Sequence, residues 1–397
     1  MIEEQKLSKN CCNAKENEVC TSDKETATHI FPMITPLSAI SEVPVSLPGH
    51  AQPFVIGSIE TPIGLVLQVS SALTWRDHWG TIKARWGVGR MDYTIEPGIY
   101  ALGNPGNESP VLVTANYKMS FDRLREALSG RNAWILIMDT DGINVWCAAG
   151  KGTFGTEELL RRIMLSGLTK IITHRELILP QLSGPGVAAH QVKKLSGFRV
   201  HYGPIRAVDV PSYLDSGLKA TPEMRVKTFT LRERIVLIPI ELVAAFKAVL
   251  LILLAFFLLG GLGGPAGYWA NAINYGLFAI VALLTAVIAG AVLTPILLPI
   301  LPGKAFSFKG FITGILAAAL LLVVRNPDLT LWPGRLEALA WFFLVPACAA
   351  YLAMNFTGAS TYTSLSGVKK EMRLALPLEI GAGVAGLGFW LTSRIIA

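Results

Sequence analysis

The sequence predicts an α/β domain with a mainly parallel sheet, followed by an all-α membrane domain of five helices. Of the 397 residues, 52% are hydrophobic and only 16% are charged, which is too apolar for an ordinary soluble protein. The charges are unevenly spread: from Ile235 onward there are nine Lys or Arg and five Asp or Glu, against 26 and 23 before it. The two parts of the chain are therefore suited to different solvents.

The first part alternates short apolar runs with helical patterns between about residues 53 and 209. The apolar runs FVIGSIE, PVLVTAN and AWILIMD read as strands, SFDRLREALSG and TEELLRRIMLSGL read as helices, and KIITHRELILP follows them. This βαβ rhythm predicts a mainly parallel sheet, whose sites collect at the carboxyl ends of the strands. We expect Ser120 to cap one helix, with Asp122 in its first turn, and Thr156 to cap the next.

Composition also predicts the domain boundaries: a flexible extension over 1–45, the α/β domain over 46–215, a linker over 216–234 and the membrane domain over 235–397. Three cysteines of the extension, Cys11, Cys12 and Cys20, could bind a metal, but no spaced fourth ligand accompanies them. Without a C-x-x-C pair or a secretory signal, the five cysteines predict a reducing, cytosolic environment. The net charge of +7 has no dense basic run, so nucleic acid is not an expected partner.

Five hydrophobic stretches are candidates to cross a bilayer, which requires about 20 apolar residues. They lie near 235–262, 271–300, 310–325, 336–356 and 376–396. Lys and Arg gather before the first, between the second and third, and before the fifth, which predicts a multi-pass protein of the cytoplasmic membrane with its N-terminus inside and its C-terminus outside. Glu241, Lys247 and Glu379 could mark a transport path, but all three are close to helix ends and can snorkel. We therefore expect an anchor, with Cys348 as a packing thiol.

The stretch NVWCAAGKGTFG, residues 144–155, holds the most informative cysteine. Cys147 could be a buried thiol, a metal ligand or a nucleophile. A nucleophile needs a histidine base nearby in space, and His174, His190 and His201 are available without a recognisable spacing. Spacing alone leaves these roles open.

Gly150, Gly152 and Gly155 fit the G-x-G-x-x-G pattern of dinucleotide-binding loops. A P-loop is excluded because Val145 and Gly152 occupy positions that need Gly and Ser or Thr. A dinucleotide fingerprint fits better, with an acid 21 residues past the last glycine, yet the insert DTDGINVWCAA separates the predicted strand from the glycines. A nucleotide-binding regulatory domain on a membrane transporter thus stays an alternative.

Two segments carry a resemblance to known families. NVWCAAGKGTFGTEEL resembles the cap-helix signature of the membrane corrinoid protein family of microbial mercury methylation. PVLVTANYKMSFDRLR resembles the corrin-contacting segment that this family shares with the large subunit of the corrinoid iron–sulfur protein of acetyl-CoA synthesis. The resemblance covers about residues 53–215 and implies that the α/β domain is Rossmann-like and binds a cobalamin-type corrinoid.

The resemblance also implies roles for individual residues. Cys147 is expected to be the lower axial ligand of cobalt, and a thiolate donates more electron density than a benzimidazole or water. Thr114 and Ser120 are candidates to hydrogen-bond the corrin edge or its lower tail pocket, although each also has a structural explanation as a strand end or a helix cap. The other expected contacts form the rest of the motif: Asn144, Val145, Trp146, Ala148, Ala149, Gly150 and Lys151. In this motif small residues let the backbone approach the macrocycle, and Trp146 supplies an apolar wall.

The function implied by the resemblance is that of an anaerobic, corrinoid-dependent methyltransferase. It would pass a cobalt-bound methyl group to Hg(II) and form methylmercury. Implied partners are a ferredoxin-like protein with two [4Fe-4S] clusters, a methyl-donor methyltransferase and membrane lipid. The clusters are expected on the ferredoxin-like partner because this chain has no cluster-spaced cysteines of its own. The alternative within the same chemistry is a corrinoid methyl carrier of one-carbon metabolism.

Overall fold

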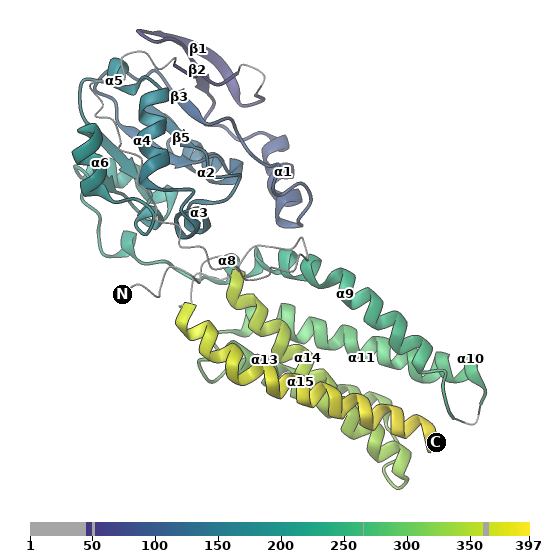
Figure 1. Cartoon of the computed structure of the whole chain (residues 1–397). Helices are drawn as coiled ribbons and strands as arrows, with labels where there is room; N and C mark the ends of the chain where they lie inside the picture. Colours follow the sequence, from purple (N-terminus) through teal and green to yellow (C-terminus); the bar gives the residue numbers. More distant parts are fainter. Residues whose placement is uncertain (1–44, 50–51, 265, 360–364) are drawn as a thin grey trace, which may run out of the picture. The chain divides into compact units, whose positions relative to one another are not determined.

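The computed structural model describes residues 45–49, 52–264, 266–359 and 365–397 (Figure 1). Contacts divide the chain into two compact units. The first unit contains the segment up to Ala84 and Val88–Val226, and the second contains Arg85–Gly87 and Lys227–Ala397. Nearly all of the expected extension, including Cys11, Cys12 and Cys20, lies outside the described residues.

A seven-stranded sheet forms the centre of the first unit, with the strand order β1-β2-β3-β5-β4-β6-β7. Its strands are β1 (Val55–Thr61), β2 (Gly64–Val69), β3 (Gly98–Leu102), β4 (Val111–Ala115), β5 (Ala133–Met138), β6 (Glu176–Leu179) and β7 (Arg199–Tyr202). Four neighbouring pairs are parallel, whereas β1–β2 and β3–β5 are antiparallel. The α/β class is confirmed, and the sheet is mixed.

Strand β4 is the point at which the direction of winding reverses. The chain leaves β4 through α2 (Lys118–Ala127) and forms β5 on one side, then passes through α3 (Val145–Lys151) and α4 (Thr156–Leu165) to form β6 on the other side. Ala115 pairs with Met138 in register, so β4 and β5 end together. Open sheets bind ligands at the carboxyl ends of strands where such a reversal occurs.

Helices cover both faces of the sheet (Figure 1). On one face, Val113 and Leu136 pack with Phe154 and Leu159 of the α4 region. The other face packs against α2 and α7 (Val210–Asp215), where Phe121 belongs to the core. Every residue of β4 and β5 is buried, in accord with their unbroken apolar sequences. The remaining elements of this unit are α1 (Trp75–Arg85), α5 (Leu168–Ile171), α6 (Ala189–Ser196), η4 (Gln181–Ser183), η5 (Ala207–Asp209) and η6 (Glu223–Arg225).

The two expected helix caps are wrong. Helix α2 begins at Lys118 with Tyr117 as its N-cap, so Ser120 lies inside the first turn and Asp122 lies beyond it. The helix extends back to Lys118 because that residue's amide donates to the Tyr93 carbonyl over 3.0 Å and its ammonium pairs with Asp122. Helix α4 has Gly155 as its N-cap, and the Thr156 hydroxyl instead accepts a hydrogen bond from the amide of Ala188 over 2.8 Å.

Within the residues that the structure describes, the second unit contains four helices long and apolar enough to cross a membrane: Tyr268–Leu297, Phe306–Arg325, Trp332–Thr357 and Gly367–Ile395. A bent pair, Leu231–Phe246 and Ala248–Leu259, makes a fifth candidate if its two segments, inclined at 53°, form one span. The expected count of five therefore depends on this pair. The last helix begins earlier than expected and includes Lys369, Lys370 and Arg373 in its first turns.

These apolar helices are α9 (Ile238–Leu259) preceded by α8 (Leu231–Ile235), the run from α10 (Tyr268–Asn271) to α12 (Thr294–Leu297), α13 (Phe306–Arg325), α14 (Trp332–Ala359) and α15 (Leu365–Ile395). The run from α10 contains α11 (Leu277–Val287) and two π-helical segments, η7 (Ala272–Gly276) and η8 (Ile288–Leu293). Small residues bring the helices together: a Cβ added to Gly290 would lie 2.5 Å from the Ala349 carbonyl oxygen. A buried Glu337 pairs with Arg325 at 3.1 Å and with Arg394 at 3.5 Å.

Candidate functional site

Helix α3 lies at the carboxyl end of the sheet and carries Cys147. It follows the loop that leaves β5 and contacts both β4 and η4, the short turn after β6. The Asn144 side chain caps the helix by accepting a hydrogen bond from the Cys147 amide over 2.9 Å. Gly152 ends it in the left-handed conformation, with φ of 88°. The helix is thus held at both ends, and the glycine turn out of a cap helix that the resemblance implied is present.

The two faces of α3 have different surroundings. Val145, Ala148 and Ala149 are buried in the core of the first unit. Trp146 is 45% exposed, Gly150 is exposed and Cys147 is half-buried. The outward face available to a ligand is therefore formed by Trp146, Cys147, Gly150 and the exposed Lys151.

The small residues of α3 allow it to lie close to the protein. A Cβ added to Gly186 would come within 3.0 Å of the Ala149 Cα and 2.2 Å of the Phe154 carbonyl oxygen. Ala148 and Ala149 were expected beside the macrocycle, whereas their side chains point into the core. In this structure they allow the helix that carries Cys147 to pack closely against the core.

Asn116, the first residue after β4, organises the loop that leads into α3. Its side-chain oxygen accepts hydrogen bonds from the Thr140 amide (3.1 Å), the Thr140 hydroxyl (2.8 Å) and the Gly142 amide (3.1 Å), while its Nδ2 donates to Asp139 over 3.2 Å. Gly142 has φ of 69°, and an added Cβ would lie 2.6 Å from Thr94. Asn116 was missed from the sequence; its signal was a polar residue directly after the buried run PVLVTA.

The other two expected contacts, Thr114 and Ser120, lie away from the outward face of α3. Thr114 is only 3% exposed and shares the sheet face of Leu112, opposite the face on which Ala148 and Ala149 pack, because side chains alternate along a strand. Ser120 is half-buried in the first turn of α2. Contact of either residue with a corrin remains a prediction.

An open cavity of about 560 Å³ lies at the carboxyl edge beside the Asn116 loop. Its lining includes Thr94, Asn116, Lys118 and Asp139. Lys118 is engaged in the protein: its ammonium contacts Asp77 of α1 and lies 2.7 Å from Asp122. The lysine at this cavity therefore belongs to a buried ion cluster.

Arg125 completes the ion cluster, with contacts of 3.0 Å to Asp77 and 2.8 Å to Asp122. Burial alone raises the pKa of Asp77. The hydrogen bond and charge of Lys118, together with hydrogen bonds from Thr74, outweigh that effect and hold the pKa well below the ordinary value of an aspartate. The cluster therefore joins α1 to α2 through buried ion pairs, in which the Asp77 carboxylate stays charged.

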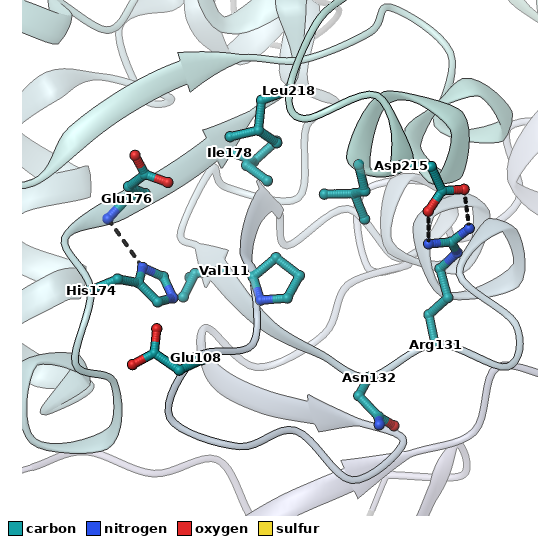
Figure 2. Close-up of a pocket in the computed structure, with 11 residues that line it drawn as sticks. Glu108, Val111, Arg131, Asn132, His174, Glu176, Ile178, Asp215 and Leu218 are labelled. Atoms are coloured by element: carbon teal, nitrogen blue, oxygen red, sulfur yellow. Dashed lines mark hydrogen bonds and ion pairs between the residues drawn. The ribbon is translucent and has the colours of Figure 1, made fainter.

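A second cavity, of about 510 Å³, lies at the amino edge of the strands (Figure 2). Arg131 makes a double hydrogen bond to Asp215 at 2.7 and 2.6 Å, and lowers the pKa of that carboxyl. The His174 ring accepts from the Glu176 amide at 3.2 Å and lies 3.0 Å from the Ser109 carbonyl oxygen. Because His174 precedes β6 and Cys147 follows β5, they lie at opposite edges of the sheet, so His174 is not the base of a Cys147 nucleophile.

The glycine pattern does not form a single phosphate-binding loop. Gly150 lies inside α3, Gly152 is its C-cap and Gly155 is the N-cap of α4. The dinucleotide fingerprint requires its glycines in the turn that joins a strand directly to a helix. Here a complete helix separates β5 from that turn, so the geometry does not favour the nucleotide-binding alternative.

Comparison with known proteins relates the first unit to enzymes of acetyl-CoA chemistry. Residues 88–214 match the family described as the CO dehydrogenase/acetyl-CoA synthase delta subunit. Among curated proteins, the gamma subunit of the acetyl-CoA decarbonylase/synthase complex of Methanocaldococcus jannaschii is 33% identical over 96 residues, which are 24% of this chain and 20% of that protein. The gamma 2 subunit of Methanosarcina thermophila is 32% identical over 133 residues, 32% and 27% of the two chains.

The gamma subunit of Archaeoglobus fulgidus is 25% identical over 128 residues, 32% of this chain and 27% of that protein. The chain therefore spans between a fifth and just over a quarter of the length of these relatives. The family match includes β4, α3 and Cys147, and it ends before Lys227, where the main segment of the second unit begins. The apolar helices are outside the matched segment.

Proposed function

We propose that this chain is a membrane-anchored corrinoid protein that passes a methyl group to Hg(II). The observation that carries the proposal is Cys147 on the outward side of a short helix whose ends are both fixed, at the reversal point of an α/β sheet. Similarity to subunits of acetyl-CoA synthesis supports one-carbon chemistry in general. Mercury as the acceptor rests on the resemblance of NVWCAAGKGTFGTEEL.

Several features of α3 fit a corrinoid. Cys147 offers a sulfur donor, and Trp146 beside it offers an exposed apolar wall. Three residues further on, a Cβ added to Gly150 would meet no atom within 4 Å, so the surface there is open. The Thr153 hydroxyl is buried without a hydrogen-bond partner among the described residues, which leaves a polar atom for a ligand to satisfy.

Each residue of the site then has a definite task. The corrinoid, when bound, would supply a cobalt–carbon bond whose methyl group can be transferred. Cys147 would hold it through sulfur, and the bond from its amide to Asn144 fixes the backbone from which that sulfur projects. Asn116 fixes the preceding loop, and Ala149 with Gly186 fixes the depth of the helix.

Replacement of the cysteine tests this proposal. The full chain and its Cys147→Ala variant are purified anaerobically, and corrinoid absorption and methylmercury formation are measured. We expect a shifted spectrum and loss of methyl transfer, because the sulfur donor is removed while the buried face of α3 is unchanged. Cys348→Ala, which removes a thiol of the second unit, is the matched control and should behave as wild type. An unchanged spectrum together with normal transfer in Cys147→Ala would refute the assignment.

The second candidate, a methyl carrier of one-carbon metabolism, is favoured by the names of the relatives. Both functions use the same residues of α3. They separate when the methyl-loaded protein is offered Hg(II) or an organic thiol and the two transfer rates are compared. A rate that is measurable only with the organic acceptor would establish the carrier function and exclude mercury as substrate.

For the complete system we propose a ferredoxin-like partner with two [4Fe-4S] clusters, a methyl-donor methyltransferase and a location in the cytoplasmic membrane. The apolar helices support the location. Five spans put Ala397 outside, whereas four spans return it to the cytoplasm, so the bent pair decides the topology. A reporter active only outside the cytoplasm, fused after Ala397, is expected to work; a silent reporter would show that the bent pair does not cross.

A further inference from the structure

Helix α1 exposes a row of large apolar side chains that the fold does not use. Trp75, Trp79 and Ile82 recur at intervals of four and three residues, which places them on one side of α1, and Trp86 directly follows the last residue of the helix. Their exposed fractions are 73%, 50%, 41% and 48%, and the rings of Trp75 and Trp79 stack with centroids 6.4 Å apart. Three exposed tryptophans in one short segment are costly in water.

The opposite side of α1 is firmly attached to the first unit. Asp77, Gly80 and Ala84 are buried, and a Cβ added to Gly80 would lie 2.6 Å from the Tyr93 ring. Asp77 contacts Lys118 and Arg125 in the ion cluster. Because this inner side determines the position of α1, the outward tryptophans are not explained by the folding of the unit itself.

The charges around the tryptophans are mainly basic. Residues 70–91 contain four basic side chains and a single acid, Asp77, which is buried in the ion cluster. Arg76 and Lys83 are exposed. Tryptophan is enriched at the boundary between lipid and water, and exposed cations are attracted to anionic headgroups. Both features match an anionic lipid surface.

We propose that α1 is an interfacial helix whose tryptophan side lies in the headgroup layer of the membrane that this chain's own helices cross. The inference rests on the membrane location in the proposed function and is independent of methyl transfer. A lipid surface is the favoured occupant because the apolar helices of the second unit, once inserted, would keep the first unit at a bilayer. Interfacial contact would hold the first unit there by a second attachment besides the chain connection.

Photocrosslinking tests the proposal on the full chain in lipid nanodiscs. A benzophenone amino acid replaces Ile82 on α1, and the matched control carries it at Ile56, a 64% exposed isoleucine of β1 in the same unit. We expect lipid adducts at position 82 and few at position 56, detected by mass spectrometry. The yield at position 82 should increase several-fold when phosphatidylglycerol is included, because of Arg76 and Lys83.

Equal lipid adducts at both positions would overturn the proposal, as would adducts at position 82 to a second copy of the chain or to its own second unit. A yield at position 82 that is unchanged by phosphatidylglycerol and by Arg76→Glu with Lys83→Glu would also overturn it. Corrinoid content is read from absorption in the same samples. Lipid adducts without corrinoid would contradict the proposed function and support the interfacial position of α1. Corrinoid without lipid adducts would support the proposed function and contradict the interfacial position of α1.

Discussion

The two edges of the sheet in the first unit differ in how their polar groups are used. At the amino edge, the groups around the cavity satisfy one another: Arg131 pairs with Asp215, and His174 bridges Ser109 and Glu176. At the carboxyl edge, α3 turns a half-buried cysteine outward, and the hydroxyl of Thr153 has no partner among the described residues.

The presence of a cavity does not by itself identify the functional site of this unit. The two cavities are similar in volume, about 510 and 560 Å³. What distinguishes the carboxyl edge is topology, because strand ends, loops and helix starts converge where the winding reverses at β4. Side chains there are held by a rigid framework and still face outward.

The largest expected effect is from Cys147→Ser, which keeps the shape of the side chain and replaces the sulfur donor with a hydroxyl. We expect methyl transfer to fall by roughly 100-fold or more, as losses of metal-ligand interactions do. The rate is measured with methyl-loaded protein under anaerobic conditions. If the Cys147→Ser variant transferred methyl groups at a rate within about threefold of wild type, the carboxyl edge would no longer be distinguished from the amino edge as the functional site.

The second effect concerns the buried ion cluster, compared with the exposed Arg131–Asp215 pair. Asp77→Asn should reduce the free energy of opening α1 by about 3 kcal/mol, because two buried cations lose an anion. Hydrogen exchange of the α1 amides measures this. Since the folded-state pKa of Asp77 is depressed, its contribution is complete above the unfolded pKa near 3.8 and is lost as pH falls below it. In wild type, the protection of the α1 amides should decrease below about pH 4, and in Asp77→Asn this decrease should be absent. The same decrease in Asp77→Asn would contradict this account.

A smaller effect is expected when a larger side chain is introduced where α3 packs closely against Gly186. Gly186→Val should destabilise the first unit by about 1–3 kcal/mol and lower corrinoid content, because its Cβ would overlap the Phe154 carbonyl oxygen and press on Ala149. The measurements are hydrogen exchange of the α3 amides and cofactor absorption. The matched control is Gly150→Ala, whose Cβ has no atom within 4 Å and should leave the stability of the cofactor-free unit unchanged or higher. Loss of stability in the control alone would reverse our assignment of the faces of α3.

The smallest effect is predicted at the amino edge. Arg131→Ala removes an exposed pair with Asp215, and such pairs contribute little to stability. Corrinoid content and methyl transfer should remain within about twofold of wild type. If Arg131→Ala instead abolished transfer, the cavity of Figure 2 would have to be included in the functional site.

Much of the architecture followed from local sequence patterns. PVLVTAN and AWILIMD became β4 and β5 because unbroken apolar runs suit strands buried on both faces. The apolar helices of the second unit were recognisable because crossing a bilayer imposes a minimum length on a hydrophobic segment. Cys147 was singled out by the motif around it, and its place on a helix after β5 agrees with that interpretation.

Other features were decided only in three dimensions. The helix caps shifted because Lys118 and Thr156 found partners distant in the sequence, Tyr93 and Ala188. The face of α3 that meets the core depends on the close approach of Gly186, more than thirty residues away.

By itself, the sequence determined the α/β class, the main strands, the hydrophobic lengths and the cysteine of interest, since each depends on neighbours along the chain. The tertiary structure decided that β1 pairs antiparallel with β2 and β3 antiparallel with β5, that Asn116 holds the loop before α3, and that Ala149 faces inward while Cys147 lies on the outward side. These properties arise from contacts between residues far apart in sequence, and a local pattern contains no information about which distant side chain will fill a given space.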